Sequence, residues 1–394
     1  MKVKIDKLDY FGRGIANTPK KVFVRDAHIG ETLDIKITKM HKTYDEGIIK
    51  SILESKKRIE SQCPYYPACG GCDLRSYEYN DTINYKLNNV KEILKDYINS
   101  DTLINIYKSK SFMRNKVVFK VKNSKIGFYE KKTHDLIEIK LCFNIKPSIN
   151  KIIPYLNSLN IINGEILVRT NYTDELLVSI KTKDKVDTTV LESFPNIKGI
   201  ILNDKTIYKD NYFYDKIDSY IFKVSYNSFF QVNSYINGKI FNLLKMELGK
   251  DKNVLDLCSG VGTLSTLASS FSKKVYGIEI NKNSYQDSLE NIKLNGIKNC
   301  NFINGDAFKL MNDINDKIDT IIIDPPRSGI SKKGINSILN YNFNKLIYIS
   351  CNPITLKRDL SYLKEKYKLN KLYILDMFPY TYHVESFCVL DRKN

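Results

Sequence analysis

Three residues near the C-terminal end of the chain carry groups that can do covalent and proton-transfer chemistry. Cys351 lies in the sequence Ser-Cys-Asn-Pro, Asp324 begins the sequence Asp-Pro-Pro-Arg, and Glu385 lies in the sequence His-Val-Glu-Ser. A thiolate is a strong nucleophile, and a carboxylate can accept a hydrogen bond or remove a proton. The combination predicts nucleophilic catalysis with a separate general base.

These groups suit methyl transfer to carbon 5 of a pyrimidine, which is a poor nucleophile in the free base. A thiolate that adds to carbon 6 makes an enolate, and carbon 5 can then attack a methyl sulfonium. A base must afterwards remove the proton from carbon 5 so that the thiolate can leave. Cys351 is the candidate nucleophile and Glu385 the candidate base. The Asp-Pro-Pro-Arg sequence at Asp324 alone would also suit methylation of an adenine amine.

A glycine turn after an apolar strand predicts a cofactor site. The strand contains Asp256, and the turn that follows it contains Cys258, Gly260 and Gly262 before a helix expected over Thr263–Ser270. Glycines let a ligand approach the backbone closely where a strand ends. The turn has no Walker lysine and no third glycine, which disfavours nucleoside triphosphates and dinucleotides.

Two further acidic residues follow the next strands of the same segment. Glu279 comes 23 residues after Asp256, near the end of the second strand. A carboxylate at that position can accept hydrogen bonds from both hydroxyls of a ribose. Asp306 follows the third strand, where a polar side chain can reach an adenine amine.

Alternating strands and helices from about residue 231 onward predict a parallel sheet covered by helices. Asp324 and Cys351 each follow a strand, so both are expected at the ligand-binding edge of that sheet. The expected strands are Asn253–Leu257, Val275–Ile280, Thr320–Ile323, Lys345–Ser350 and Lys371–Phe378, with Phe387–Leu390 as the last strand.

The preceding part of the chain has a different pattern. Residues 1–55 contain short strands punctuated by glycine and proline, which is typical of a small β-barrel. Apolar residues three and four apart predict a helix over residues 81–98. Residues 112–230 are expected to be mostly β.

Four cysteines form a candidate metal site. Cys63, Cys69 and Cys72 have the spacing C-x5-C-x2-C, and Cys142 follows seventy residues later. Four thiolates can hold either zinc or an iron–sulfur cluster, and spacing alone does not separate the two. The spacing differs from the C-x3-C-x2-C loop of radical enzymes that cleave S-adenosylmethionine. Other cysteines, such as Cys300, are expected to be small buried apolar residues.

The length and the charge of the chain limit the classes of protein to which it can belong. The chain has 394 residues, enough for two or three domains, and a formal net charge of +18. Residues 1–150 hold 29 Lys and Arg against 18 Asp and Glu, which suits a polyanionic partner, although the whole chain is rich in Lys. No signal peptide or membrane-spanning run is present, so we expect a cytoplasmic protein that contacts no membrane. We expect a monomer.

The motifs together resemble the RNA uracil-5-methyltransferases, a family of class I S-adenosylmethionine-dependent enzymes, over essentially the whole chain. The resemblance implies that Cys351 is the nucleophile, Glu385 is the general base and Asp324 binds the uracil edge near the cofactor. It also implies that Gln231, in Phe-Phe-Gln-Val-Asn, contacts cofactor and base. The cofactor set is Gln231, Asp256, Cys258, Gly260, Gly262, Glu279, Asp306 and Asp324. The chain departs from the family at Cys258, where an aromatic residue is common.

The N-terminal part resembles a TRAM domain, a small RNA-binding barrel, through the sequence Gly-Arg-Gly-Ile-Ala over residues 12–16. The family's ribosomal-RNA branch carries a [4Fe-4S] cluster on the pattern of Cys63, Cys69, Cys72 and Cys142, so the resemblance implies that cluster, with zinc as the alternative. The expected domains are a TRAM barrel (1–56), a mostly β central domain with the cluster (57–230) and an α/β, Rossmann-like methyltransferase domain (231–394). The helix at 81–98 could pack on the methyltransferase domain.

Basic and aromatic side chains are candidates for RNA contact. The stretch around Arg114 and Lys116 resembles the family's RNA-facing region. A target base inside a helix is inaccessible, so the uridine is expected to flip out between the central and catalytic domains. The candidate phosphate contacts are Lys20, Lys21, Arg25, Lys39, Lys42, Lys56, Lys57 and Arg58. The candidate stacking residues are Tyr65, Tyr66, Phe112, Phe128 and Tyr129.

The sequence therefore predicts S-adenosylmethionine-dependent methylation of carbon 5 of a uridine in bacterial 23S ribosomal RNA. The TRAM domain and the cysteine pattern favour the ribosomal branch. The first alternative is the same reaction on the T-loop uridine of tRNA. The second is an iron–sulfur RNA-binding factor without catalysis, which the intact set of Cys351, Glu385 and Asp324 disfavours.

Overall fold

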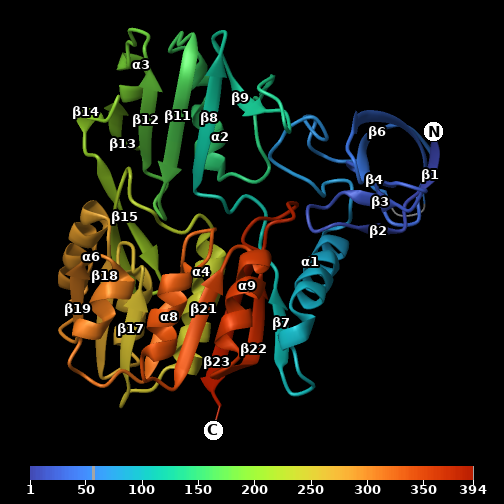
Figure 1. Ribbon diagram of the computed structural model, residues 1–394. Coiled ribbons are helices and arrows are strands. Elements are labelled where there is room, and N and C mark those ends of the chain that lie inside the picture. The colour runs from blue at the N-terminus through green and yellow to red at the C-terminus, as the bar shows by residue number, and fades with distance from the viewer. Residues whose placement is uncertain (56–57, 394) are drawn as a thin grey trace. The chain divides into compact units, whose positions relative to one another are not determined.

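The computed structural model describes residues 1–55 and 58–393, so Lys56 and Lys57 lie outside the described residues. The chain divides into two compact units, each described here by itself (Figure 1). Unit 1 comprises Met1–Asn89, Gly127–Ile139 and Phe378–His383, and unit 2 comprises Val90–Ile126, Lys140–Met377 and Val384–Asn394. The domain boundaries expected after residues 56 and 230 stay predictions.

Unit 1 begins with a six-stranded sheet of order β1-β5-β6-β4-β3-β2. Apolar and polar residues alternate along its strands, so that one face buries residues such as Val24 and Leu33 in a common core. The small β-structure predicted for this part of the sequence is therefore present. The strands are β1 (Lys2–Lys4), β2 (Lys7–Leu8), β3 (Gly14–Ala16), β4 (Lys21–Val24), β5 (Thr32–Met40) and β6 (Tyr44–Glu54).

The cysteine-containing segment 58–77 packs on this barrel through polar contacts. Arg58 forms ion pairs with Asp26 and Glu31, each at 2.9 Å. The Tyr66 hydroxyl also donates a hydrogen bond to Asp26. Two of the side chains proposed for RNA contact, Arg58 and Tyr66, are thus engaged inside the protein.

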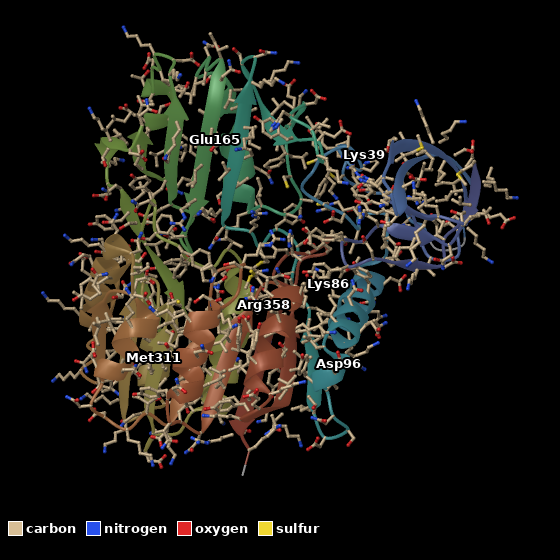
Figure 2. All side chains as sticks on the ribbon, in the orientation of Figure 1. Lys39, Lys86, Asp96, Glu165, Met311 and Arg358 are labelled. Atoms are coloured by element: carbon tan, nitrogen blue, oxygen red, sulfur yellow. The ribbon has the colours of Figure 1, made fainter. Side chains whose placement is uncertain are left out.

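The predicted helix over 81–98 is shorter than expected. Helix α1 covers Tyr79–Ile93, and a 3-10 turn, η1 (Lys95–Tyr97), follows it. The apolar spacing extends past the end of the helix. Leu94 is fully buried, although α1 ends at Ile93. In the middle of α1, the buried Lys86 donates a hydrogen bond to the carbonyl oxygen of Phe378 at 2.8 Å (Figure 2).

Unit 2 contains a sheet in which β8, β11, β12, β13 and β14 are neighbours in that order. Helix α2 (Pro147–Asn157) packs on β11, so the mostly β prediction for this part missed one amphipathic helix. The strands of this part of the chain are β8 (Lys116–Lys122), β9 (Lys125–Tyr129), β10 (Leu136–Glu138), β11 (Asn163–Thr170), β12 (Leu176–Thr182), β13 (Ile197–Leu202), β14 (Lys205–Lys209), β15 (Tyr212–Ile217) and β16 (Tyr220–Ser225), with the short helix α3 (Thr189–Glu192) before β13.

The second sheet of unit 2 has eight strands in the order β19-β18-β17-β20-β21-β23-β22-β7. Its first five strands are parallel, as predicted, whereas β23 is antiparallel to both of its neighbours. The alternation of strands and helices predicted a purely parallel sheet, and this prediction is wrong for β23. The strands are β7 (Leu103–Tyr107), β17 (Asn253–Leu257), β18 (Lys274–Glu279), β19 (Cys300–Asn304), β20 (Thr320–Ile323), β21 (Lys345–Ser350), β22 (Tyr367–Leu375) and β23 (Glu385–Arg392).

Helices cover both faces of this second sheet. Helices α4, α5 and α6 contact one another in series, as do α7, α8 and α9, and Figure 1 shows α8 beside α9. Right-handed crossovers between parallel strands put the two series on opposite faces. The helices are α4 (Ser234–Glu247), α5 (Thr263–Ser269), α6 (Lys282–Leu294), α7 (Ala307–Leu310), α8 (Lys332–Asn340) and α9 (Pro353–Leu363).

The central strands of this sheet form the core of the unit, with residues such as Ile322 and Leu346 fully buried. This arrangement confirms the α/β class predicted from the sequence. Among the described residues, no helix has both the length and the apolar character needed to cross a membrane.

Candidate active site

Cys351 lies in the turn between β21 and α9. The strand ends at Ser350, and Asn352 caps the helix by accepting a hydrogen bond from the Ile354 amide at 3.1 Å. Pro353 occupies the first helical position, where its fixed φ suits a helix start. The sequence Ser-Cys-Asn-Pro therefore encodes an abrupt change from strand to helix, and it leaves the half-buried Cys351 at the carboxyl edge of the sheet.

Glu385 reaches the same edge from the antiparallel strand β23. The β21–β23 register pairs Ser350 with Ser386, so the register, continued by one residue past the end of β21, places Cys351 opposite Glu385. Opposed residues of antiparallel strands place their side chains on the same face. Glu385 is 4% exposed, and its buried Oε1 atom accepts no hydrogen bond within the described part of the chain.

Asp324 and Gln231 complete this group. Asp324 follows β20, the parallel neighbour of β21, and accepts a hydrogen bond from Gln231 Nε2 at 3.2 Å. The Gln231 carbonyl oxygen accepts a hydrogen bond from Asn115 Nδ2 at 3.4 Å, which ties the preceding sheet to this segment. The structure thus joins Gln231 to Asp324, and the contacts of either residue with cofactor or base stay predictions.

Helix α9 holds the loop that follows Asp324. Arg358 donates hydrogen bonds to the carbonyl oxygens of Ser328 at 3.0 Å and Ile330 at 2.8 Å (Figure 2). The buried Asp359 accepts a hydrogen bond from the Ile330 amide at 2.8 Å. Because the same helix begins just after Cys351, the loop and the cysteine are held by one element.

Burial dominates the electrostatics of the three reactive groups. It raises the pKa of Asp324 to about 7, while the hydrogen bond from Gln231 acts in the opposite direction. Burial and the charge of Asp324 raise the pKa of Glu385 well above its usual value. Burial, then the carboxylates of Glu385 and Asp324, raise the pKa of the Cys351 thiol to about 11. The site therefore favours protonated groups that can act as acids and, once deprotonated, as strong bases or nucleophiles.

The predicted cofactor turn adopts a backbone that suits close ligand approach. Cys258, Gly260 and Gly262 have φ values of +65°, +57° and +78°, in the left-handed region. Glu279 accepts hydrogen bonds from the Gly260 amide at 2.8 Å and the Asn281 amide at 2.6 Å. Its carboxylate is thus fixed beside the glycine turn, with capacity to accept further hydrogen bonds.

The other two predicted cofactor residues have structural roles visible in the fold. Asp256 is fully buried and accepts a hydrogen bond from Ser265 Oγ at 2.5 Å, which links β17 to α5. Burial raises the pKa of Asp256 to about 7. Asp306 caps α7 by accepting a hydrogen bond from the Phe308 amide at 3.0 Å. Any contact of Asp256 or Asp306 with a cofactor stays a prediction.

The cysteines proposed as cluster ligands are half-buried and are not disulfide-bonded. In unit 1, Cys69 Sγ accepts a hydrogen bond from the Gly71 amide at 3.4 Å, and Cys72 Sγ accepts one from Arg75 Nε at 3.2 Å. Cys63 lies in the same loop, whereas Cys142 belongs to unit 2. Over residues 1–55 and 58–393, no three His, Cys, Asp or Glu side chains come together as ligands of one metal ion. The sulfur chemistry suits a cluster, but no such ligand group is found among the described residues, so the cluster prediction is not confirmed.

Sequence reasoning missed the residues that position Gln231. Asn233 caps α4 and donates hydrogen bonds from Nδ2 to Ser109 Oγ at 2.7 Å and to the Met377 carbonyl oxygen at 3.1 Å. An asparagine just before a helical pattern was the available signal. Its partners are more than a hundred residues away in the chain, so the sequence pattern could not identify them.

Comparisons with known proteins agree with this architecture. A family model described as tRNA (uracil-5-)-methyltransferase matches residues 185–393, and the TRAM domain model matches residues 1–50. The structure of the Pyrococcus abyssi tRNA (uracil-54, C5)-methyltransferase in complex with S-adenosyl-L-homocysteine has a TM-score of 0.83. It is 23% identical over 99% of both chains, a likeness that shows the shared fold.

Two bacterial relatives, both described as uncharacterized RNA methyltransferases, align along the whole chain. The protein of Caldanaerobacter subterraneus subsp. tengcongensis is 32% identical over 99% of this chain and 97% of the relative. That of Fusobacterium nucleatum subsp. nucleatum is 32% identical over 100% and 96%. Because a family model matches more than half of the chain and these relatives align over nearly all of it, the chain belongs to the S-adenosylmethionine-dependent RNA uracil-5-methyltransferase family and carries an N-terminal TRAM domain.

Proposed function

We propose that this protein methylates carbon 5 of a uridine in 23S ribosomal RNA. The observation that carries the proposal is the opposed pair of Cys351 and Glu385, with Asp324 and Gln231 hydrogen-bonded beside it. A nucleophile and a buried base on one face of a sheet edge are what attack at carbon 6 and proton removal at carbon 5 need.

In the proposed reaction, the Cys351 thiol gives up its proton to solvent, its sulfur forms a bond to carbon 6 of the uracil, and the ring becomes an enolate. S-adenosylmethionine, when bound, would supply the methyl group to carbon 5 and would leave as S-adenosylhomocysteine. Glu385 then takes the proton from carbon 5, the double bond re-forms, and the carbon–sulfur bond breaks. Asp324, oriented by Gln231, binds the polar edge of the base throughout.

The raised pKa of Glu385 supports its role as the base. A carboxylate whose conjugate acid has a raised pKa holds the abstracted proton more firmly at neutral pH. We further propose that Glu279 binds the cofactor ribose, because its carboxylate is fixed beside Gly260. The amide end of Gln231 and the turn residues Cys258 and Gly262 would lie along the rest of the cofactor.

The choice of 23S RNA rests on the combination of a TRAM domain with the four-cysteine pattern. The alternative substrate is the T-loop uridine of tRNA, since a structure of the same fold belongs to a tRNA (uracil-54, C5)-methyltransferase. The test is transfer of a radiolabelled methyl group to total RNA from cells that lack the gene, followed by size separation. Label in 23S RNA supports the proposal, and label in tRNA overturns the substrate assignment. The Cys351→Ala variant gives the background.

We also propose that Cys63, Cys69, Cys72 and Cys142 hold a [4Fe-4S] cluster. The hydrogen bonds to the sulfurs of Cys69 and Cys72 support it, because such donors stabilise the negative charge of metal-bound thiolates. Anaerobically purified protein should contain about four iron and four sulfide per chain and absorb visible light. Cys69→Ser should lose them, whereas Cys300→Ser, which alters a buried strand cysteine, should keep them. Stoichiometric zinc without sulfide would contradict the proposal.

A further inference from the structure

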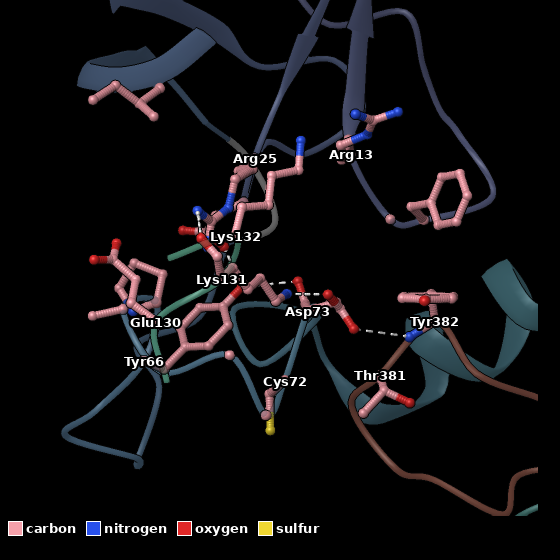
Figure 3. A pocket seen from close by; sticks show the side chains of 18 of the residues that line it. Arg13, Arg25, Tyr66, Cys72, Asp73, Glu130, Lys131, Lys132, Thr381 and Tyr382 are labelled. Carbon is pink, nitrogen blue, oxygen red and sulfur yellow. Dashed lines mark hydrogen bonds and ion pairs between the residues drawn. The ribbon is translucent and has the colours of Figure 1, made fainter. Parts of the chain in front are cut away.

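A cavity of about 700 Å³ opens within unit 1 (Figure 3). Its walls come from the barrel, the cysteine loop, the segment 130–132 and the segment 381–383. A cavity of this size can hold one or two nucleotides. None of the residues proposed for catalysis lines it, whereas Cys72, a proposed cluster ligand, does.

One wall of the cavity is aromatic. Phe11 lies at this wall with 44% of its surface exposed, which is unusual for so large an apolar side chain. Its ring packs edge-on against Tyr382, with ring centroids 5.4 Å apart, and Tyr382 packs against Tyr10 at 5.5 Å. The three rings support one another, and the Arg13 guanidinium lies 5.5 Å from the Phe11 ring centroid, so a base that stacks on the exposed surface of Phe11 also meets a cation.

The opposite wall is cationic. Figure 3 shows Arg25 and Lys132 on one side of the cavity and Tyr382 on the other. Lys131 forms an ion pair with Asp73, and Lys132 forms one with Glu46 at 2.6 Å.

Arg25 differs from these lysines. Its Nη1 atom donates only a long hydrogen bond, 3.5 Å, to the Lys131 carbonyl oxygen, and no carboxylate of the described residues lies within ion-pair distance of it. A guanidinium that carries an uncompensated charge is a suitable partner for a phosphate.

The acidic residues of the cavity do not neutralise this cation. Asp26 forms an ion pair with Arg58 and accepts a hydrogen bond from the Tyr66 hydroxyl. Asp73 forms an ion pair with Lys131 and accepts a hydrogen bond from the Tyr382 amide. Glu130 lines the cavity and forms no ion pair within the described part of the chain. Its carboxylate can accept a hydrogen bond from an exocyclic amine of a base.

From this arrangement we propose that the unit 1 cavity binds an unpaired nucleotide of the RNA substrate. Its base stacks on Phe11 and its phosphate binds Arg25. Bases of a duplex are stacked on one another and cannot enter, so the cavity selects single-stranded RNA. The proposal rests on RNA being the substrate, but it does not depend on which uridine is methylated.

The test is binding of fluorescent single-stranded oligonucleotides and of a duplex of equal length to the full-length, metal-loaded protein. Phe11→Ala should weaken single-strand binding about tenfold, because a stacked base is lost. Phe11→Tyr, which keeps the ring, should restore it. Arg25→Ala should lower the slope of log affinity against log salt by about 0.7, the change expected for one phosphate contact on a single strand.

Two control variants outside the cavity show whether a loss of RNA binding is specific to the cavity. Lys36→Ala removes one exposed positive charge outside the cavity, and Met40→Ala removes an exposed apolar side chain. Both should bind single strands like the wild type. The proposal is wrong if Phe11→Ala and Arg25→Ala bind single strands as the controls do. It is also wrong if these variants weaken binding of the duplex as much as binding of single strands. Unchanged RNA affinity would favour an acidic peptide as the occupant of the cavity. Absence of methyl transfer by the wild type would overturn the proposed function but leave this binding test intact.

Discussion

Cys351 and Glu385 lie one residue beyond the paired residues Ser350 and Ser386 of the antiparallel strands β21 and β23, and the charge of Glu385 acts on the Cys351 thiol. Their proximity is set by strand register, so replacing one side chain leaves the position of the other unchanged. The two roles proposed for them, nucleophile and base, can therefore be separated by mutation.

Glu385→Gln should stop the reaction after methyl transfer. The amide cannot remove the proton from carbon 5, so the bond between Cys351 and the RNA persists. We expect a covalent complex of protein and methylated RNA on denaturing gels, and turnover lowered by about two to four orders of magnitude.

Two variants serve as controls for this experiment. Cys351→Ala should give neither complex nor turnover, and Glu365→Gln, at an exposed position on the same domain, should behave like the wild type. Normal turnover by Glu385→Gln, with no covalent complex, would show that another group is the base.

The reactivity of Cys351 should rise steeply with pH in the RNA-free enzyme. Its pKa is raised to about 11, first by burial and then by Glu385, so the thiolate fraction increases about tenfold per pH unit below that value. The rate of alkylation by iodoacetamide, followed by mass spectrometry of the Cys351 peptide, should increase in this way between pH 7 and pH 10.

Glu385→Gln should lower the pKa of Cys351, because it removes a negative charge that disfavours the thiolate. Alkylation at pH 8 should then be faster than in the wild type, while Glu365→Gln should have no effect. A slower reaction in Glu385→Gln would mean that Glu385 instead promotes ionisation of the thiol.

Local sequence patterns were enough to predict where Asp324 and Cys351 lie in the sheet. Asp324 and Cys351 follow apolar runs and precede residues that break a strand, so their place at the carboxyl edge follows from neighbouring residues. The glycine turn and Glu279 could be located in the same way, because a parallel sheet brings successive strand ends together.

The position of Glu385 opposite Cys351 could not be predicted in this way. It depends on β23 inserting antiparallel between β21 and β22, and long-range pairing leaves no local periodicity. The same holds for β7, which joins this sheet from residues 103–107.

Asp306 offers a test of cofactor binding with a matched stability control. Its side chain caps α7, and that of Ser331 caps α8 by accepting a hydrogen bond from the Gly334 amide at 3.1 Å. Asp306→Ala and Ser331→Ala should each lower the free energy of unfolding by about 1 kcal/mol. Only Asp306→Ala should also weaken S-adenosylmethionine binding, which calorimetry can measure. Equal affinity in the two variants would remove Asp306 from the cofactor site.

Alanine substitutions at the two glycines of the cofactor turn should differ in how much they lower the free energy of unfolding. A Cβ at Gly262 would lie 2.5 Å from Cζ of the buried Phe302, whereas nothing lies within 4 Å of a Cβ at Gly260. Both have positive φ, which costs an alanine about 1–2 kcal/mol. Gly262→Ala should therefore lose roughly 1–3 kcal/mol more unfolding free energy than Gly260→Ala, because of the overpacking.

Gly260→Ala should instead lose cofactor affinity, because its methyl group fills space that the ligand would approach. Gly296→Ala is the control: Gly296 has a φ of +63° and open space around its Cβ, but it follows α6 rather than the cofactor turn. Urea unfolding should give Gly260→Ala and Gly296→Ala similar losses of stability, and calorimetry should show weakened S-adenosylmethionine binding for Gly260→Ala alone. If Gly260→Ala binds the cofactor as Gly296→Ala does, the ligand does not approach this turn, and the ribose role proposed for Glu279 fails with it.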